Sequence, residues 1–427
     1  MTSNKPLTGG LALSAYAVAS RAIPLIAPPL LRRRLKHGKE DAERWREKLG
    51  EPTAKRPDGP LVWLHAVGLG EVLALRGLIT SMSAQNPTLN FLVTSTARSS
   101  AQVMGSNLPP RTIHQFLPLD APQYLRKFLD HWRPDLSIWS EQDLWPNAIL
   151  QADARAIPVA LVNARITDAS LQKRRLGRAL YAAMFARMSL IAAQEERTAA
   201  NLRNLGAQNV RVTGSLKSAA PALGYDTEAL TAAKALFAHR TPWLAASTHQ
   251  GDETVALQAQ QALCAQPSAP LLILAPRDIA RARQIAQQVS ALGLTPQLRS
   301  EGIALSDATQ VYIADTYGEL GLFYRLCDRA LIGGGFDAIG GHNPWEAAAL
   351  DCAILHGPDT ANFEADYRQL HDADAATQTS AATLSTDLSQ TDHATKIHNA
   401  RALSDAARDA LTPLAADLCA LMPKASE

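Results

Sequence analysis

Glu71 is the first residue whose type and position could support chemistry. It closes the segment His65-Ala-Val-Gly-Leu-Gly-Glu71, in which an apolar strand runs into a glycine-containing turn and then a helix. Gly68 and Gly70 let the backbone approach a ligand closely. A helix N-terminus lowers the pKa of a carboxylate, which would leave Glu71 ionised and able to accept a proton. Glutamate is also an ordinary first-turn residue, so the segment alone leaves that alternative open.

Two further charged sites follow apolar runs in the first half of the chain. Glu141 and Asp143 lie in Ser140-Glu-Gln-Asp-Leu-Trp-Pro-Asn147, directly after an apolar strand, where they place negative charge at its carboxyl end. The same segment also fits a helix cap with proline in the first turn. Lys217 ends Thr213-Gly-Ser-Leu-Lys217 and could steady a carboxylate or a phosphate, or lie solvated on the surface.

A separate group in the second half has the features of a nucleotide site. An arginine at a strand end can clamp a phosphate, and glycine turns before helices expose backbone N–H groups to anions. A carboxylate one turn into a helix could bind ribose hydroxyls. The segments are Pro276-Arg277, Asp315–Leu320, Gly333–Gly335 and Gly340–Glu346. No Walker or Rossmann fingerprint is present, so it is their order and strand-end positions that favour nucleotide binding.

The elements that must position these residues alternate short apolar runs with longer amphipathic ones. This pattern predicts parallel strands joined by crossover helices, including helices at 122–132 and 171–187. We expect strands at residues 61–67, 91–96, 136–140, 158–163, 190–194, 210–214, 243–247, 271–276, 311–315, 330–334 and 353–357.

A pause in the pattern at Lys217–Asp226, where Ser, Ala, Pro and Gly collect, predicts a boundary between two domains in this chain of 427 residues. We predict an α/β fold with two doubly wound Rossmann-like domains, residues 37–218 and 219–427, facing a central cleft. Two such domains suit a nucleotide-sugar transferase of the GT-B type. Residues 375–391 are expected to form a loop or weak helix, and residues 395–421 a terminal helix of the second domain.

Residues 1–36 are predicted to associate with a membrane. Leu7–Leu31 is largely apolar, but one arginine and three prolines interrupt it, whereas a bilayer span needs about 20 apolar residues. The basic residues Arg32–Arg34 follow it, which favours a helix lying in the interface of the anionic cytoplasmic leaflet. A helix packed on the protein's own core is the alternative.

Composition limits the other classes of partner. The chain has 42 Lys and Arg against 40 Asp and Glu, a formal charge of +2, which gives no general attraction to nucleic acid. Its four cysteines are far apart and form no CxxC motif, so neither a zinc site nor a disulfide framework is indicated. A reducing, cytosol-facing location fits this pattern.

Several of these segments, in the same order, resemble those of the Kdo (3-deoxy-D-manno-oct-2-ulosonic acid) transferases. They are HAVGLGE, EQDLWPN, LVNARI, TGSLK, STHQGDE, DTYGELGLFY and GGHNPWE, and the resemblance runs from the basic N-terminal stretch to about Phe363. It implies a GT-B glycosyltransferase that transfers Kdo from CMP-Kdo to a lipid A precursor in lipopolysaccharide biosynthesis. It also implies a peripheral membrane protein on the cytoplasmic side of the inner membrane, with no tightly bound metal and no cofactor.

By this resemblance Glu71 is the catalytic base of an inverting reaction, and Glu141 and Lys217 support the transition state. The residues that would hold CMP are Pro276, Arg277, Tyr317, Gly318, Glu319, Asn343, Pro344, Trp345 and Glu346.

Some positions depart from the family pattern: Asp143 stands where Glu is usual, and Tyr317 where Met is common. Two alternatives follow from such departures. The first is a GT-B transferase that uses another CMP- or UDP-linked sugar on a different lipid or capsule acceptor. The second is a catalytically silent lipid-binding or scaffold protein, against which the presence of Glu71, Glu141 and Lys217 argues.

Overall fold

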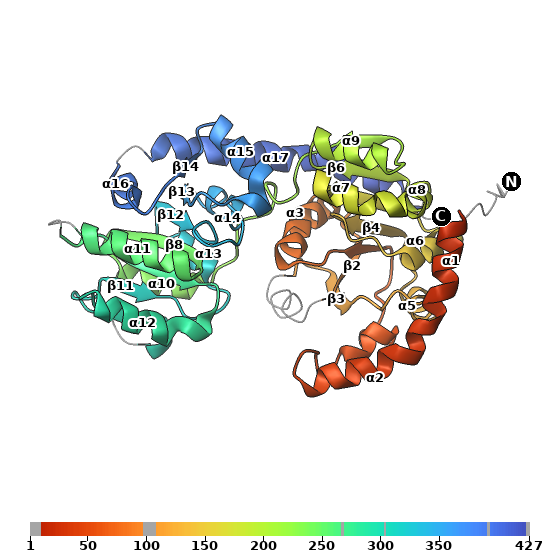
Figure 1. Cartoon of the computed structure of the whole chain (residues 1–427), viewed down its shortest axis with the longest axis horizontal. Coiled ribbons are helices and arrows are strands. Elements are labelled where there is room, and N and C mark those ends of the chain that lie inside the picture. The colour runs from red at the N-terminus through yellow and green to blue at the C-terminus, as the bar shows by residue number, and fades with distance from the viewer. Residues whose placement is uncertain (1–9, 97–107, 266–268, 303–304, 391–392, 424–427) are drawn as a thin grey trace. The chain divides into compact units, whose positions relative to one another are not determined.

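The computed structural model describes residues 10–96, 108–265, 269–302, 305–390 and 393–423. The chain divides into two compact units: the first comprises Met1–Ala219 and Ala407–Glu427, and the second Ala220–Ala406. Among the described residues, each unit forms a seven-stranded parallel sheet covered by helices (Figure 1). The predicted α/β class with two doubly wound Rossmann-like sheets is therefore confirmed.

The sheet of the first unit has the strand order β3-β2-β1-β4-β5-β6-β7. Its strands are β1 Leu61–His65, β2 Asn90–Ser95, β3 Thr112–Phe116, β4 Leu136–Ser140, β5 Val159–Ala164, β6 Leu190–Ala193 and β7 Val210–Val212. Successive residues of β1 enter different cores: Leu61 and Trp63 pack on one face of the sheet, Val62 and Leu64 on the other. Strands buried on both faces are expected to be apolar throughout, as these runs are.

Helices cover both faces of this sheet. They are α3 Leu69–Gln85, α5 Pro122–Trp132, α6 Pro146–Ala154, α7 Asp168–Arg174, α8 Arg178–Phe185 and α9 Glu196–Asn204, with the 3-10 turn η2 Trp45–Leu49. The single helix predicted at 171–187 is divided by the 3-10 turn η3 Arg175–Gly177, because Gly177 weakens the helix at that point.

The sheet of the second unit has the order β10-β11-β9-β8-β12-β13-β14. Its strands are β8 Pro242–Thr248, β9 Leu271–Pro276, β10 Pro296–Leu298, β11 Val311–Ile313, β12 Arg329–Ile332, β13 Ala353–His356 and β14 Ala376–Gln378. Its helices are α10 Thr227–Leu236, α11 Gln250–Leu263, α12 Ala282–Ala291, α13 Leu320–Tyr324, α14 Trp345–Ala348, α15 Glu364–Asp372 and α16 Leu384–Ser389, with the 3-10 turns η4 Ile279–Arg281, η5 Arg299–Glu301 and η6 Ala361–Phe363.

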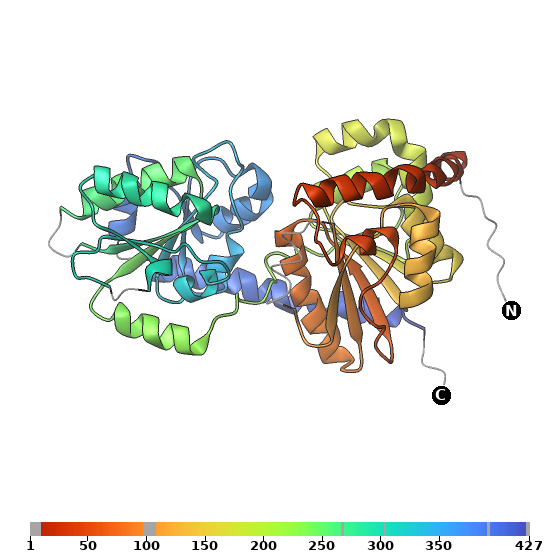
Figure 2. The same cartoon turned by 90° about the horizontal axis from the view of Figure 1, so that it is seen from below.

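Two predictions about the second half need correction. Residues 375–391 contain the edge strand β14 and the short helix α16 rather than a loop or one weak helix. The terminal helix, α17 Ala394–Ala420, is not confined to the second domain: its early residue Ala400 packs in the core of the second unit, whereas Leu411, Leu414 and Leu418 pack in the core of the first. The long blue helix in Figure 2 is α17.

The N-terminal stretch is helical from Leu11 to Lys36, as α1 Leu11–Ala19, the 3-10 turn η1 Ser20–Ala22 and α2 Ile23–Lys36. Figure 2 shows it in red, running along the first unit. Within the described part of the chain, it is the one helical stretch long and apolar enough to cross a membrane by length and composition. Residues 7–9 of the predicted apolar segment lie outside the described residues.

Candidate active site

The first unit has a topological switch point between β1 and β4. From β1 the chain proceeds to β2 and β3 on one side, whereas β4 and the later strands lie on the other. In open parallel sheets, ligands bind outside the carboxyl ends of the strands at such a point. The loop after β1 leads to Glu71, and the loop after β4 begins with Glu141. Two sequence-predicted residues therefore follow the two strands that flank the switch point.

Glu71 is the third residue of α3 and lies beside the backbone that precedes the helix. Its carboxylate accepts a hydrogen bond from the Val67 N–H at 3.1 Å. A Cβ atom at Gly68 would lie 3.2 Å from Glu71 Oε1, so glycine leaves room beside this carboxylate.

The predicted direction of the Glu71 pKa shift is wrong. Burial raises the pKa of Glu71, and the nearby Glu141 carboxylate raises it further. Hydrogen bonds from the backbone at Val67 and Gly68, together with the Lys217 charge, lower it by less. Desolvation therefore outweighs the helix terminus, and Glu71 is a stronger base than an exposed glutamate.

Glu141 and Lys217 form a buried ion pair. The Lys217 Nζ atom lies 2.8 Å from Glu141 Oε1, and both side chains are about one-tenth exposed or less. The alternative of a solvated surface lysine is therefore excluded. Glu141 has a φ of 64°, a left-handed conformation that is uncommon outside glycine and is often found at functional sites.

Asn163 was not identified from the sequence as a functional residue, although it lies in the quoted LVNARI segment. It is fully buried near the end of β5, with a φ of 52°, and its Oδ1 accepts a hydrogen bond from the Leu216 N–H at 3.0 Å. This contact fixes the loop that presents Lys217. An amide within an otherwise apolar strand is the signal that could have indicated it, because buried polar groups require partners.

Asp143 lies near the buried His65, which ends β1. His65 Nε2 and Asp143 Oδ2 are 3.9 Å apart, and His65 Nδ1 lies 3.0 Å from both oxygen atoms of Thr94. The nearby His65 ring lowers the pKa of Asp143, despite partial burial. The first unit therefore gathers three carboxylates, a lysine and a histidine around one switch point.

The second unit has its own switch point, between β8 and β12. His249 follows β8 and His342 follows β12, and their Nε2 atoms lie 2.9 Å apart with the rings stacked. Burial lowers the pKa of His342 to about 4, assisted by His249 and by the Arg277 guanidinium. Neither histidine had a role predicted from its residue type or position in the sequence.

Asp252 organises the glycine turn at this second switch point. It is fully buried in α11, and its carboxylate accepts hydrogen bonds from the N–H groups of Gly334 at 2.6 Å, Gly335 at 3.2 Å and Phe336 at 3.1 Å. A Cβ atom at Gly333 would lie 2.4 Å from the Ser247 carbonyl oxygen, so this position requires glycine. The predicted Gly333–Gly335 turn is thus held from within the unit.

The residues predicted to hold CMP lie at the strand ends and at α14. Arg277 follows β9, and its charge influences the pKa values of both His342 and Glu346, which places it near both. Burial raises the pKa of Glu346 to about 7, against hydrogen bonding to Asn343. Pro276 and Pro344 are buried beside them.

The remaining predicted residues differ in exposure. The side chain of Tyr317 is 74% exposed, and Gly318 has a φ of 83°. Glu319 pairs with Arg299 at 2.7 Å, which lowers its pKa. Trp345 is 2% exposed, and its indole N–H donates to Asp366 at 2.7 Å, so its ring is part of the core.

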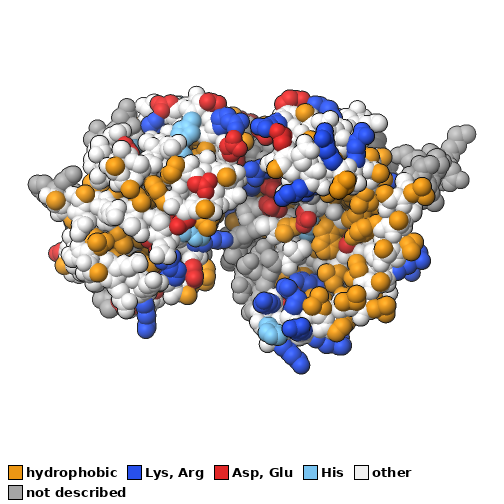
Figure 3. Space-filling view, in the orientation of Figure 1, with side chains coloured by type: hydrophobic (Ala, Val, Ile, Leu, Met, Phe, Trp, Pro, Cys, Tyr) orange, Lys and Arg blue, Asp and Glu red, His pale blue; other side chains and the backbone are white. Residues whose placement is uncertain are grey.

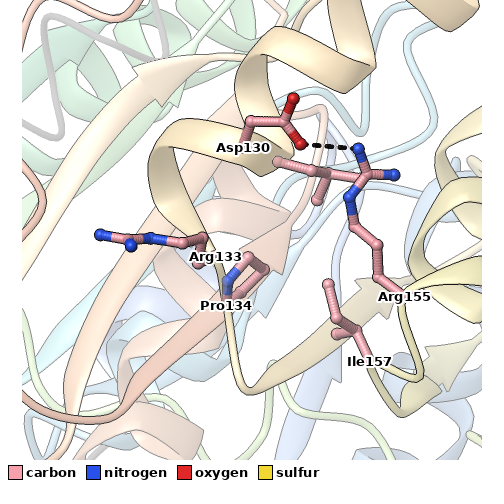
Figure 4. Close-up of a pocket in the computed structure, with 6 residues that line it drawn as sticks. Asp130, Arg133, Pro134, Arg155 and Ile157 are labelled. Carbon is pink, nitrogen blue, oxygen red and sulfur yellow. Dashed lines mark hydrogen bonds and ion pairs between the residues drawn. The ribbon is translucent and has the colours of Figure 1, made fainter.

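A pocket of about 360 Å³ lies elsewhere, lined by Leu129, Asp130, Arg133, Pro134, Arg155 and Ile157 (Figure 4). Its residues precede β4 and β5, at the edge of the sheet opposite to the switch-point loops. In Figure 4 Arg155 points toward Asp130, to which it is paired at 2.7 Å. No predicted site residue lines it.

Comparison with known proteins identifies the family. The model of the 3-deoxy-D-manno-octulosonic-acid transferase (kdotransferase) family matches residues 43–220. The probable mitochondrial 3-deoxy-D-manno-octulosonic acid transferase of Arabidopsis thaliana is 33% identical over 84% of this chain and 82% of that protein. The chain belongs to the Kdo transferase family. The Kdo transferase of Rickettsia bellii is also 33% identical, over 76% of this chain and 78% of its own length.

This Kdo transferase family member is a glycosyltransferase, as the sequence analysis predicted. The region matched by the family model contains Glu71, Glu141 and Lys217. Among solved structures, the UDP-GlcNAc 2-epimerase of Neisseria meningitidis has a TM-score of 0.55 at 13% identity, covering 83% of this chain and 100% of that chain. That similarity concerns the fold alone. Among the described residues, no group of three or more His, Cys, Asp or Glu is placed to hold a metal ion.

Proposed function

We propose that this protein transfers Kdo from CMP-Kdo to a lipid A precursor, with inversion at the anomeric carbon. The observation that carries the proposal is the raised pKa of Glu71 beside the buried Glu141–Lys217 pair at the switch point. Catalytic bases are commonly carboxylates whose pKa is raised by burial and by a neighbouring charge. No cofactor is required by this chemistry.

In the proposed reaction Glu71 accepts the proton of the acceptor hydroxyl. The acceptor oxygen forms a bond to the anomeric carbon while the bond from that carbon to the CMP phosphate breaks, and CMP leaves. Positive charge develops at the sugar, where the carboxylate of Glu141 is favourable. Lys217 holds Glu141 in place through their ion pair.

The second unit would bind the donor nucleotide. Arg277 suits phosphate and Glu346 suits the ribose hydroxyls, while the glycine turn held by Asp252 fixes the backbone beside them. Tyr317, Gly318, Glu319, Asn343 and Pro344 would complete the CMP site, with Trp345 supporting it from the core.

The N-terminal helical stretch would bind the cytoplasmic face of the inner membrane. Leu13, Ser20 and Ala27 are buried at intervals of seven residues, two turns of helix. Positions two residues earlier lie on the opposite side, and there Leu11, Val18 and Leu25 are 91%, 61% and 82% exposed. A helix that packs by one side and exposes apolar residues on the other suits an interface rather than a span.

Charge extends this membrane-facing surface. Figure 3 shows hydrophobic side chains gathered over α1 and α2, with Lys and Arg where α2 ends; the last turn of α2 contains Arg33, Arg34 and Lys36. Basic residues also flank Leu176, with Arg175 before it and Arg178 after it. Leu176 is fully exposed in η3, which is next to α8, and α8 packs on α1. Basic residues near apolar ones favour anionic lipid headgroups.

The test is CMP release from CMP-Kdo, generated in situ, with a lipid A precursor in detergent. Glu71→Gln should lower acceptor-dependent release by about 10²–10⁴-fold, because it removes the base. Glu228→Gln, an exposed glutamate in the first turn of α10, is the matched control and should keep full activity. Release of UDP from UDP-linked sugars, with no release of CMP from CMP-Kdo, would contradict the proposed donor. Activity of Glu71→Gln equal to that of wild type would contradict the proposed base.

A further inference from the structure

A buried polar cluster joins the N-terminal helix to the body of the first unit. The Tyr16 hydroxyl donates to Asp120 Oδ2 at 2.8 Å. The Asn147 side-chain amide donates to Ser20 Oγ at 2.9 Å and to the Asp120 carbonyl oxygen at 2.7 Å. Ser20, Asp120 and Asn147 are each less than one-tenth exposed. Burying three polar side chains for attachment alone is costly, since apolar contacts would serve that purpose.

The cluster caps the start of α6. The helix begins at Pro146, and its next two N–H groups, those of Asn147 and Ala148, donate to the Asp120 carboxylate at 3.2 and 3.1 Å. The first N–H groups of a helix have no partner within the helix, so Asp120 acts as a cap supplied from elsewhere in the chain. It also places negative charge at the positive end of the helix dipole.

The residues directly before α6 form the loop that carries Glu141. The loop is short, from Glu141 to Trp145, and its first residue is fixed by the Glu141 N–H, which donates to the Val162 carbonyl at 3.2 Å. Its other end is the capped start of α6. Glu141 also has a left-handed backbone, a conformation that persists when its surroundings constrain it.

We propose that the N-terminal helix is a positioning element of the active site. Through Tyr16 and Ser20 it completes the cluster around Asp120 and Asn147, which fixes the start of α6 and so the loop that presents Glu141. In this role the four residues act through the position of Glu141. This inference rests on the proposed role of Glu141, and it gives the inner side of the helix a task distinct from that of its exposed apolar side.

Burial raises the pKa of Asp120 to about 6, although Tyr16 and the α6 N–H groups favour its ionised form. The cluster is therefore closely balanced, and the loss of a donor such as the Tyr16 hydroxyl makes the carboxylate harder to keep ionised at neutral pH.

The experiment compares Tyr16→Phe/Ser20→Ala with wild type as full-length protein in detergent. Amide hydrogen exchange reports directly on the cap: the N–H groups of Asn147 and Ala148 should exchange about tenfold faster or more, while those of β5 stay protected. In the CMP-release assay kcat should fall about tenfold or more, with KM for the donor unchanged, because a small displacement of a catalytic group is costly.

The pH profile separates positioning from simple loss of stability. Glu141 raises the pKa of Glu71, so a displaced Glu141 moves the acid limb of kcat/KM to lower pH, whereas partial unfolding lowers activity without moving it. Ser14→Ala, an exposed serine of the same helix, is the control. Val18→Ser/Leu25→Ser should weaken sedimentation with anionic vesicles while leaving amide exchange at Asn147 and Ala148 unchanged.

Unchanged exchange at Asn147 and Ala148 would overturn the inference, as would an activity loss that follows the unfolded fraction with an unshifted pH profile. A wild type that transfers no Kdo would count against the proposed function instead, and the exchange measurement would then decide the inference alone.

Discussion

Both units are seven-stranded parallel sheets with one switch point, but their strand orders differ and they equip their switch points differently. In the first unit, the loops after β1 and β4 bring together Glu71, Glu141 and Lys217, whose charges are buried and balanced against one another. In the second unit, the corresponding loops after β8 and β12 contribute His249 and His342 beside the glycine turn, and the buried carboxylate of Asp252 is bound to backbone N–H groups.

The two switch points are therefore suited to different functions. Electrostatic interactions are stronger where solvent exposure is low. Buried charges therefore respond strongly when a proton moves or when charge develops nearby, which suits a reacting centre. A turn whose N–H groups are held by an internal acid is a fixed support, and with the Arg277 guanidinium near it this unit suits recognition of an anionic nucleotide. Each sheet thus supplies a switch point, and the side chains there differ in the chemistry that they can perform.

Removing Lys217 should have the largest effect. Lys217→Met leaves Glu141 buried without its partner, which should destabilise the first unit by about 3–5 kcal/mol and lower CMP release at least about 10²-fold. Thermal unfolding and the release assay measure the two effects.

Glu141→Gln/Lys217→Met should recover most of the stability and none of the activity, because it removes both charges together. Lys234→Met, an exposed lysine of α10, is the control. Recovery of activity in the double variant would show that the pair is only structural, and the contrast between the two units would fail.

In the second unit the corresponding change is Asp252→Asn. The amide offers one acceptor oxygen in place of two, so at least one N–H group of the glycine turn loses its partner. CMP should bind about tenfold more weakly, about 1.4 kcal/mol, by calorimetry, with little change in the pH profile of kcat. Asp226→Asn, an exposed N-cap of α10, is the control, since asparagine caps equally well. An unchanged CMP affinity would remove the turn from the donor site.

The sequence was sufficient to predict the central strands, because each is apolar on both faces. It was not sufficient for β3, β10 and β14, and all three are strands at the edges of their sheets. An edge strand is paired on one side only and can be short and polar, as Ala376–Gln378 is. The apolar pattern that identifies the central strands is therefore absent.

The candidate site was predicted less completely than the fold. Glu71, Glu141 and Lys217 were identified because charged residues at strand ends stand out against apolar runs. The direction of the Glu71 pKa shift was not, because it depends on burial and on Glu141, which is 70 residues away in sequence. Asn163 and Asp252 act through backbone N–H groups brought to them by the fold, and a motif does not reveal such contacts.

The smallest expected effect is the pH dependence of stability. His342 in the second unit and Glu71 in the first should affect it in opposite directions. Burial lowers the pKa of His342 from 6.5 to about 4, so its contribution is complete above pH 6.5 and is lost as pH falls toward 4. Burial raises the pKa of Glu71 above 4.5, so its contribution is complete below pH 4.5 and is lost as pH rises through its folded value. The free energy of unfolding of wild type relative to that of His342→Gln should therefore decrease below pH 6.5, by at most about 1.4 kcal/mol per pH unit. The free energy of unfolding of wild type relative to that of Glu71→Gln should instead decrease as pH rises. Thermal unfolding from pH 4 to 7 measures both differences in stability. If both decreased as pH fell, or both as pH rose, burial would not be what sets the pKa values of these two groups.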